Sequence, residues 1–113
     1  MRKPLVLGSL VTLVAALLTA GPALSARKTV EVDDNYFVRE GDPPTVKVER
    51  NDRVVWEWEG TNPHNVTVTR GPVEFQSKTK TSGTYRKRVT RRGTYKIVCT
   101  IHRPQMRMTL RVQ

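Results

Sequence analysis

The sequence predicts an all-β protein, a sandwich of two sheets with about seven to eight short strands. From residue 27 onward, apolar and polar residues alternate with a period of two, and no segment has the apolar spacing of an amphipathic helix. Turn-forming pairs separate the alternating segments at Asn51-Asp52, Ser82-Gly83 and Arg92-Gly93. Short alternating segments divided by turns are typical of a β-sandwich.

The expected strands follow one another along the whole chain after residue 27. They contain Val30 and Val32, Val46 and Val48, and residues 54–59, 65–70, 84–89, 94–99 and 106–112. In the 54–59 strand both tryptophans fall on one face and both glutamates on the other, so we expect one buried and one solvent-facing side. The side chains of the last strand that should point inward are Met106, Met108, Leu110 and Val112.

Residues 1–26 have the layout of a secretory signal peptide. Arg2 and Lys3 precede a long uncharged segment whose end is rich in small residues, so we expect cleavage after Ser25 or Ala26. An uncleaved membrane anchor is the alternative, because a bilayer span needs about 20 apolar residues. Small and polar residues within the segment favour cleavage. We therefore expect an exported protein, in the periplasm, at the outer face of the cytoplasmic membrane or outside the cell, with no integral membrane domain after cleavage.

The remaining residues, 27–113, number about 87 and suffice for one small domain with a modest core. Exported domains of this size often depend on disulfides, yet Cys99 is the only cysteine in the chain. A lone cysteine in an exported protein is paired with another molecule, reactive, or bound to a ligand. The residues around Cys99 therefore decide its role.

Charge is distributed unevenly along the chain. The formal net charge is +10 and falls to +8 when Arg2 and Lys3 leave with the signal peptide. Residues 31–59 hold nine acidic and four basic residues, whereas residues 70–113 hold twelve basic residues and Glu74 as their one acid. A basic C-terminal half should attract an acidic partner and accelerate encounter with it.

Four residues with metal-binding side chains lie close to the ends of expected strands. Cys99, His102 and Met106 form a C-x2-H-x3-M run after the 94–98 segment, and His64 lies in a separate loop. Each of them alone would more often be an ordinary core or surface residue. Together, two imidazoles, one thiolate and a weak thioether are the ligands of a blue-copper electron-transfer site. Zinc also accepts a Cys and two His, but methionine is a poor zinc ligand, so the set favours copper.

Two segments resemble the copper-binding segments of the cupredoxin (type 1 blue-copper) family, most closely its plastocyanin and amicyanin members. They are Pro63-His64-Asn65-Val66, and the run from Gly93 to His102 that continues to Met106-Arg107. The segments 34–37 and 46–58 also resemble the first strands of that fold, so the resemblance covers nearly all of residues 27–113. It implies a cupredoxin-like Greek-key β-sandwich with one copper-binding domain.

The resemblance also implies a role for each candidate ligand. Cys99 would be the thiolate ligand, His64 and His102 the imidazole ligands, and Met106 the axial ligand. His102 would be the route of the electron, surrounded by an apolar patch that includes Pro63, Ile101 and Pro104. Asn65 resembles the asparagine that ties the two ligand loops together, with Thr100 as its expected partner.

The length of the last loop leaves an alternative for the axial ligand. Three residues separate His102 from Met106, whereas amicyanin-like loops have two residues at this place and plastocyanin-like loops have four. Gln105 occupies the position that the shorter spacing would give to the axial ligand. We prefer Met106, because Met106-Arg107 leads into the last strand as the family's methionine does, and Met108 lies deeper in that strand.

These observations predict a one-electron carrier, not an enzyme, with one copper that cycles between Cu(I) and Cu(II). Its partners would be redox proteins, acidic ones being favoured by charge, and we expect a monomer. The alternative is copper delivery or buffering outside the cell, but exposed Met-rich or His-rich tracts are absent from the sequence. The basic run at residues 86–92 also raises nucleic-acid binding. Export would separate the protein from nucleic acids, and basic runs of this kind are mostly solvated strand edges and turns. We therefore expect no nucleic-acid partner.

Overall fold

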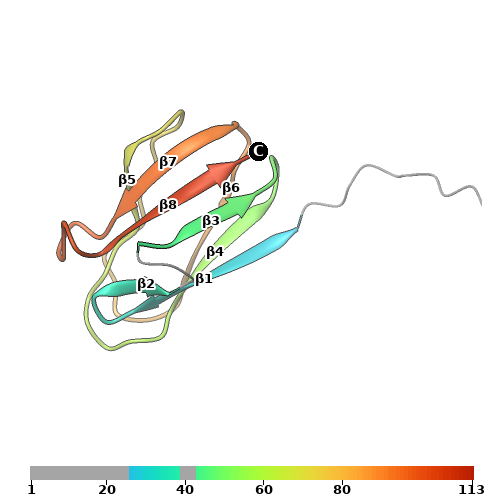
Figure 1. Cartoon of the computed structure of the whole chain (residues 1–113). Helices are drawn as coiled ribbons and strands as arrows, with labels where there is room; N and C mark the ends of the chain where they lie inside the picture. The colour runs from blue at the N-terminus through green and yellow to red at the C-terminus, as the bar shows by residue number, and fades with distance from the viewer. Residues whose placement is uncertain (1–25, 39–42) are drawn as a thin grey trace, which may run out of the picture.

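The computed structural model describes residues 26–38 and 43–113 as a sandwich of two four-stranded sheets (Figure 1). The strands are β1 (Arg27–Asp33), β2 (Tyr36–Val38), β3 (Thr45–Val48), β4 (Arg53–Trp58), β5 (Thr67–Arg70), β6 (Thr84–Arg88), β7 (Gly93–Val98) and β8 (Arg107–Val112). No helix occurs in these two ranges. The predicted all-β sandwich and its number of strands are therefore confirmed.

The order of strands brings three connections to the same end of the sheets. One sheet has the order β2-β1-β4-β6 and the other β3-β8-β7-β5. β1 runs parallel to β4, so their carboxyl ends lie side by side, with Val32 opposite Trp58. In the other sheet, Val98 at the end of β7 lies opposite Thr67 at the start of β5 and Arg107 at the start of β8. The turn after β1 and the loops after β4 and β7 therefore leave from neighbouring strand ends.

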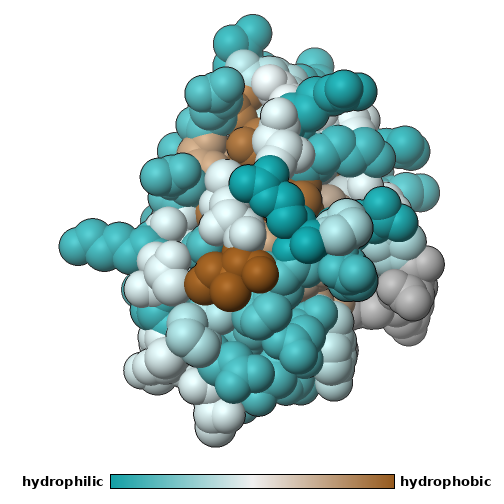
Figure 2. All heavy atoms as spheres, turned by 90° about the vertical axis from the view of Figure 1, so that its left-hand side faces the viewer, coloured by the Kyte–Doolittle hydropathy of each residue, from teal (hydrophilic) through white to brown (hydrophobic). Residues whose placement is uncertain are grey.

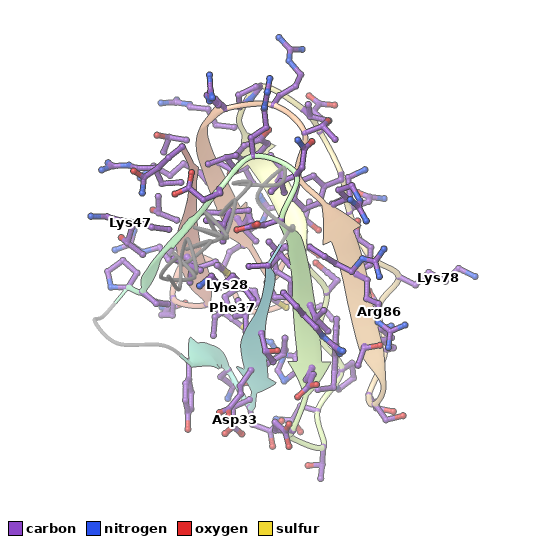
Figure 3. The ribbon with its side chains drawn as sticks, turned by 90° about the vertical axis from the view of Figure 1, so that its right-hand side faces the viewer. Lys28, Asp33, Phe37, Lys47, Lys78 and Arg86 are labelled. Carbon is purple, nitrogen blue, oxygen red and sulfur yellow. The ribbon has the colours of Figure 1, made fainter. Side chains whose placement is uncertain are left out.

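The core lies between the sheets and is built from the faces that the alternation predicts. Both tryptophans of β4 are buried, and so are the four residues predicted to point inward from the last strand. The indole nitrogen of Trp56 donates a hydrogen bond to the sulfur of Met108 at 3.4 Å, which joins β4 and β8 across the core. Each such buried side chain contributes about 1.5–3 kcal/mol through apolar burial. Lys47 and Lys78, in contrast, point away from the sandwich (Figure 3).

β4 differs from its predicted pattern of one buried and one solvent-facing side. Val55 lies on the face opposite the tryptophans, yet it is fully buried. β4 is an inner strand of its sheet, and the register places Thr29 of β1 and Arg86 of β6 on either side of Val55. The aliphatic part of an arginine side chain can cover neighbouring apolar surface. The prediction of a solvent-facing side is therefore wrong at Val55, because burial there depends on the neighbouring strands.

A buried carboxylate fixes the beginning of the domain. Asp52 is 3% exposed and accepts hydrogen bonds from the backbone nitrogens of Ala26 and Glu49, both at 2.8 Å. The nitrogen of Arg53 donates to the carbonyl of Ala26 at 2.9 Å. Ala26 is therefore held where β1 begins. The expected signal peptide lies outside the described residues up to residue 25, and within the described ranges no helix has the length and apolarity to cross a bilayer.

Candidate metal centre

Three connections meet at one end of the sandwich, on the left in Figure 1. They are the turn after β1, residues 59–66 after β4, and residues 99–106 after β7. A hydrogen bond from Asn62 to Asp34 links the first two, and one from Asn65 to Thr100 links the last two. All four predicted ligand residues lie in the two loops after β4 and β7.

The loop after β7 is closed by backbone hydrogen bonds between its own candidate ligands. The nitrogen of Cys99 donates to the carbonyl of Met106 at 3.0 Å, and the nitrogen of Met106 donates to the carbonyl of His102 at 3.0 Å. The nitrogen of His102 donates to the carbonyl of Cys99 at 3.2 Å. The backbone alone therefore sets the spacing of these three residues, whatever their side chains bind.

His64 is fixed by its backbone to a different segment. His64 and Lys80 exchange two backbone hydrogen bonds, each of 3.0 Å, which form an isolated antiparallel bridge. The expected strand at 65–70 begins only at Thr67, because the nitrogen of Val66 donates to the hydroxyl of Ser77 at 2.9 Å. The imidazole of His64 is completely buried, which leaves its ring no freedom to turn outward.

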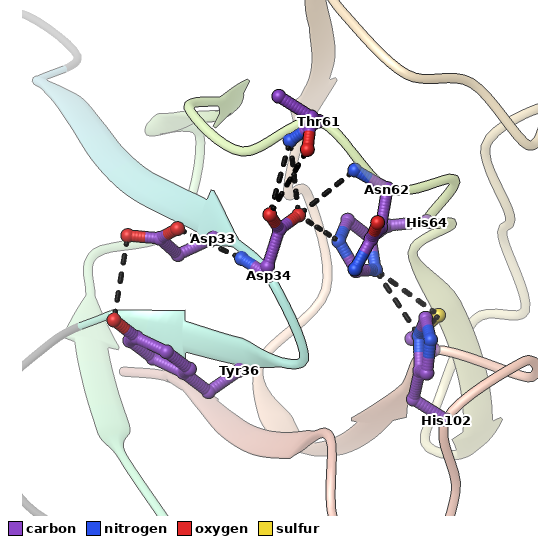
Figure 4. Close-up of polar contacts among 8 residues, drawn as sticks. Asp33, Asp34, Tyr36, Thr61, Asn62, His64 and His102 are labelled. Atoms are coloured by element: carbon purple, nitrogen blue, oxygen red, sulfur yellow. Dashed lines mark hydrogen bonds and ion pairs between the residues drawn. The ribbon is translucent and has the colours of Figure 1, made fainter.

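Two imidazole nitrogens and one sulfur converge between the loops (Figure 4). The Nδ1 atoms of His64 and His102 are 3.2 Å apart, and the sulfur of Cys99 lies 3.9 Å from the first and 3.6 Å from the second. A trigonal ion with bonds of about 2.0 Å to nitrogen and about 2.3 Å to sulfur would separate the two nitrogens by about 3.5 Å and each nitrogen from the sulfur by about 3.7 Å. The observed distances depart from these values by a few tenths of an ångström, so one metal ion fits.

The three donors differ in burial. His64 and Cys99 are both 0% exposed, whereas His102 is partly exposed. Among the residues the structure describes, these three form the one cluster of at least three His, Cys, Asp or Glu donors able to hold a metal ion. The only face of this cluster that reaches solvent is therefore the ring of His102.

The predicted tie between the two ligand loops is confirmed. The side-chain nitrogen of Asn65 donates to the hydroxyl of Thr100 at 2.8 Å, and the nitrogen of Thr100 donates to the side-chain oxygen of Asn65 at 3.1 Å. Asn65 also donates to the hydroxyl of Thr79 at 3.2 Å and accepts a hydrogen bond from Thr67 at 2.8 Å. Both N–H donors and both oxygen lone pairs of this amide are thus used within the site.

Asp34 lies on the far side of His64 and is not among the site residues predicted from the sequence. Its carboxylate accepts hydrogen bonds from the backbone nitrogens of Asn62 and Thr61 at 2.9 and 3.0 Å, and lies 3.2 Å from Nε2 of His64. The bonds from Asn62 and Thr61, with a smaller effect of His64, lower the pKa of Asp34 to about 2. The carboxylate is therefore ionised at neutral pH. Its one sequence signal is its place in the segment 34–37, which resembles the family's first strands.

The two candidates for the axial ligand occupy different environments. The side chain of Met106 is completely buried beside Cys99, whereas that of Gln105 is exposed. Met108, the third candidate, is engaged by the indole nitrogen of Trp56 deeper in the core. Burial and the backbone bonds of the loop thus favour Met106 as the fourth donor.

The basic residues divide between the two ends of the sandwich. Arg88 lies opposite Arg53 at the start of β4, and Arg91 and Arg92 precede β7, so this part of the 86–92 run lies at the end opposite the ligand loops. Near the ligands, an open groove of about 600 Å³ is lined by basic, apolar and hydroxyl side chains. Its principal members are Pro43, Lys96, Arg103, Pro104 and Arg107.

A two-sheet sandwich with a buried Cys and two converging imidazoles at one end defines a copper protein of the cupredoxin class. A family model described as copper binding proteins of the plastocyanin/azurin family matches residues 26–113, and the chain belongs to this family. Its cofactor is one copper, and membership places it, at a coarse level, among copper-binding electron carriers.

Solved structures of related proteins agree with this assignment. A reduced amicyanin variant has 26% sequence identity and a TM-score of 0.62, with 77% of this chain and 82% of that chain covered. A purple cupredoxin from Nitrosopumilus maritimus has 18% identity and a TM-score of 0.63, with 76% and 99% covered, and shows the fold alone. A search of curated proteins finds no match to the chain.

One similar structure is an enzyme. A copper-containing nitrite reductase from Thermus scotoductus SA-01 has 23% identity and a TM-score of 0.64 over 77% of this chain. The chain covers only 22% of that protein, and at this identity the likeness shows a shared fold. The expectation of a carrier is therefore supported by the family as a whole and is not decided by this one neighbour.

Proposed function

We propose that the protein is an exported, monomeric one-electron carrier whose copper is held by His64, Cys99 and His102, with Met106 as the axial ligand. The observation that carries this proposal is the convergence of two Nδ1 atoms and one sulfur within 3.9 Å of one another. Two imidazoles and one thiolate, with a weak axial thioether, are the ligand set of a blue-copper electron-transfer site.

The chain's own contribution is to hold the ligands still while the charge of the site changes. Copper supplies the one-electron chemistry when bound, and the thiolate and imidazoles suit both of its oxidation states. The backbone bonds within residues 99–106 and the Asn65 bonds resist movement of the ligands. Little reorganisation is then needed when an electron arrives or leaves.

The surface around His102 is suited to a partner that exchanges electrons. Pro63 and Pro104 are exposed, and Ile101 is 50% exposed. Figure 2, which faces the end of the molecule on the left of Figure 1, shows a compact hydrophobic patch near the centre of this face, with smaller hydrophobic areas above it, among hydrophilic residues. An apolar contact around the partly exposed imidazole would exclude water and bring a partner's redox centre close to the copper.

Enclosure of the ligands favours electron transfer over the alternative of copper delivery or buffering. Transfer of the ion itself would require a partner's ligands to replace those of the site one by one. Two of the three converging donors are 0% exposed, so such an exchange has access only through His102. An electron needs no such access. Both histidines and the only cysteine of the sequence belong to this one centre.

The contact between Ala26 and Asp52 supports the export proposal and favours cleavage after Ser25 over cleavage after Ala26. Cleavage after Ser25 leaves Ala23 and Ser25 as the small residues at the two positions that signal peptidase reads. The new amino group would be that of Ala26, whose nitrogen lies 2.8 Å from the buried carboxylate of Asp52. The ammonium group of Ala26 that cleavage frees would therefore lie beside the oppositely charged carboxylate of Asp52.

The groove beside His102 supports an acidic partner. Arg103 and Arg107 are both exposed, and with Lys96 they place positive charge along the groove. The basic residues 88, 91 and 92 lie at the other end, where they cannot guide a partner to the copper. We therefore assign docking to Arg103 and Arg107.

Cys99→Ser tests the proposed function. Addition of Cu(II) to the unmodified protein should give one copper per chain and an intense visible absorption from thiolate-to-copper charge transfer, which metal analysis and spectroscopy measure together. The variant should lose the colour, because a serine oxygen cannot replace the soft thiolate. Thr100→Ser, which keeps the neighbouring hydroxyl, should keep it. Stoichiometric zinc in protein offered copper would contradict the proposal.

Met106→Leu and Gln105→Leu separate the two axial candidates. The first should keep copper and colour but raise the reduction potential, because the axial ligand tunes the potential while the trigonal set supplies most of the binding. The second is the matched control from the same loop and should change the potential much less. Voltammetry of both variants is the measurement, and the opposite order would assign the axial role to Gln105.

The cleavage position predicts both a terminus and a stability effect. Mass spectrometry of the exported protein should find Ala26 as its first residue, and Arg27 there would refute the assignment. Asp52→Ala should lower the free energy of unfolding by about 1.5–3 kcal/mol, the usual range for a hydrogen bond to a charged group. A protein that retains Ser25 should also be less stable than one starting at Ala26, and Asp52→Ala should remove that difference.

Arg103→Glu tests the docking surface, with Arg88→Glu as a control of equal charge change at the opposite end. The reduced protein gives one electron to the anionic oxidant hexacyanoferrate(III), and stopped-flow absorbance follows the rate. Arg103→Glu should slow this reaction roughly two- to tenfold at low ionic strength, and added salt should shrink the difference as exposed charges are screened. Equal effects of the two variants would mean that only net charge matters.

A further inference from the structure

Asp34 joins the turn after β1 to the loop after β4 through a single carboxylate. It belongs to the turn after β1, it accepts hydrogen bonds from the loop after β4, and it meets the edge of the His64 ring that faces away from Cys99 (Figure 4). We propose that Asp34 is a positioning residue for the metal centre: it holds His64 with Nδ1 free for copper, and its negative charge lowers the reduction potential. This inference rests on the proposed role of His64 as a copper ligand.

The hydrogen bond to Asp34 determines which nitrogen of His64 carries the proton. An ionised carboxylate can only accept, so Nε2 of His64, 3.2 Å away, must be the donor. In a neutral imidazole the other nitrogen is then an acceptor with a free lone pair. That nitrogen is Nδ1, which faces the sulfur of Cys99 and Nδ1 of His102. Asp34 thus selects the tautomer that a metal ion requires.

The carboxylate is itself held in place, which a positioning residue requires. Backbone nitrogens of Thr61 and Asn62 donate to it, and so does the hydroxyl of Thr61 at 3.3 Å. Gly60 gives the loop its close approach, because a side-chain carbon at this position would overlap the Asp34 carboxylate. The next residue of the turn, Asn35, has a φ of 73°, a left-handed conformation that asparagine tolerates well. The turn after β1 and the loop after β4 therefore both have a backbone conformation that allows the Asp34 carboxylate to contact the loop.

The other imidazole has no equivalent support in the described part of the chain. His102 makes its side-chain contacts there through Nδ1, toward Cys99 and His64. His64 is 0% exposed while Asp34 is 35% exposed, so the charge of the carboxylate reaches the buried ligand from the surface side. The effect of Asp34 is therefore confined to one of the two histidines.

A negative charge hydrogen-bonded to a ligand affects the two copper states unequally. A carboxylate that accepts the proton of a metal-bound imidazole raises the basicity of the coordinating nitrogen. The more basic ligand and the nearby negative charge both favour Cu(II), the state with the higher positive charge. Removal of this charge should therefore raise the potential of the one-electron reduction from Cu(II) to Cu(I).

Asp34→Asn and Asp33→Asn form a matched pair for the test. Both remove one negative charge, from the last residue of β1 or from the turn that follows it, and keep an oxygen that can accept a hydrogen bond. The side chain of Asp33 bonds to the nitrogen of Asp34 and to Tyr36 and has no contact with His64 among its described bonds. Voltammetry should show a clearly larger upward shift for Asp34→Asn than for Asp33→Asn. Equal shifts would mean that the charge acts through space alone and would overturn the positioning role.

Asp34→Ala and the metal-free protein supply two further measurements. Loss of a residue that orients a metal ligand typically weakens metal binding about 10- to 100-fold, so Cu(II) affinity of Asp34→Ala should fall by this factor. In metal-free wild-type protein, the nitrogen-15 shifts of His64 should show a protonated Nε2 and an unprotonated Nδ1. The variant should populate the other tautomer.

The metal-free spectrum separates failure of this inference from failure of the proposed function. A wild-type protein that binds no copper would refute the electron-carrier proposal, yet the tautomer of His64 would still show whether Asp34 selects it. Conversely, a coloured copper protein whose metal-free His64 carries its proton on Nδ1 would keep the function and overturn the role of Asp34.

Discussion

The metal centre depends on the hydrogen bonds that the side chain of Asn65 makes with Thr100. His64 and Cys99 follow strands of different sheets, and core packing fixes only the distance between those sheets. The loops beyond the strand ends need a polar tie of their own. Asn65 directly follows His64, Thr100 directly follows Cys99, and two hydrogen bonds between them hold the ligand-bearing backbones in register. A hydrogen-bonded amide in this place orients both candidate ligands at once, which no bond within either loop could do.

Much of this arrangement could be predicted from the sequence, because the relevant signals are local. Alternation with a period of two gave the inward face of β8, and the C-x2-H-x3-M run lies in a single loop whose backbone closes on itself. The wet face expected for β4 was wrong at Val55, because burial there depends on β1 and β6 as neighbours. The contact of Asp34 with His64 was not predicted for the same reason. It spans thirty residues and depends on the parallel pairing of β1 with β4.

The two histidines illustrate how one kind of side chain can serve two purposes. His64 is enclosed, with both ring nitrogens engaged and its backbone paired with Lys80. His102 is partly exposed on a loop bordered by Ile101 and Arg103. The enclosure of His64 holds its ring rigidly in place, and the exposure of His102 gives a partner access to the site. A site built from two enclosed imidazoles would have no short route to a partner, and one built from two exposed imidazoles would admit water and competing ligands.

The basic run that raised nucleic-acid binding has a simpler consequence through its position in the fold. β6 is an edge strand, and Arg86 and Arg88 are exposed along it. An edge strand offers unpaired backbone groups to any other strand, and neighbouring charges are a common means of blocking such pairing. When two copies approach edge to edge, like charges meet before a shared ladder can form. Charges along this edge therefore oppose edge-to-edge pairing between copies of the chain.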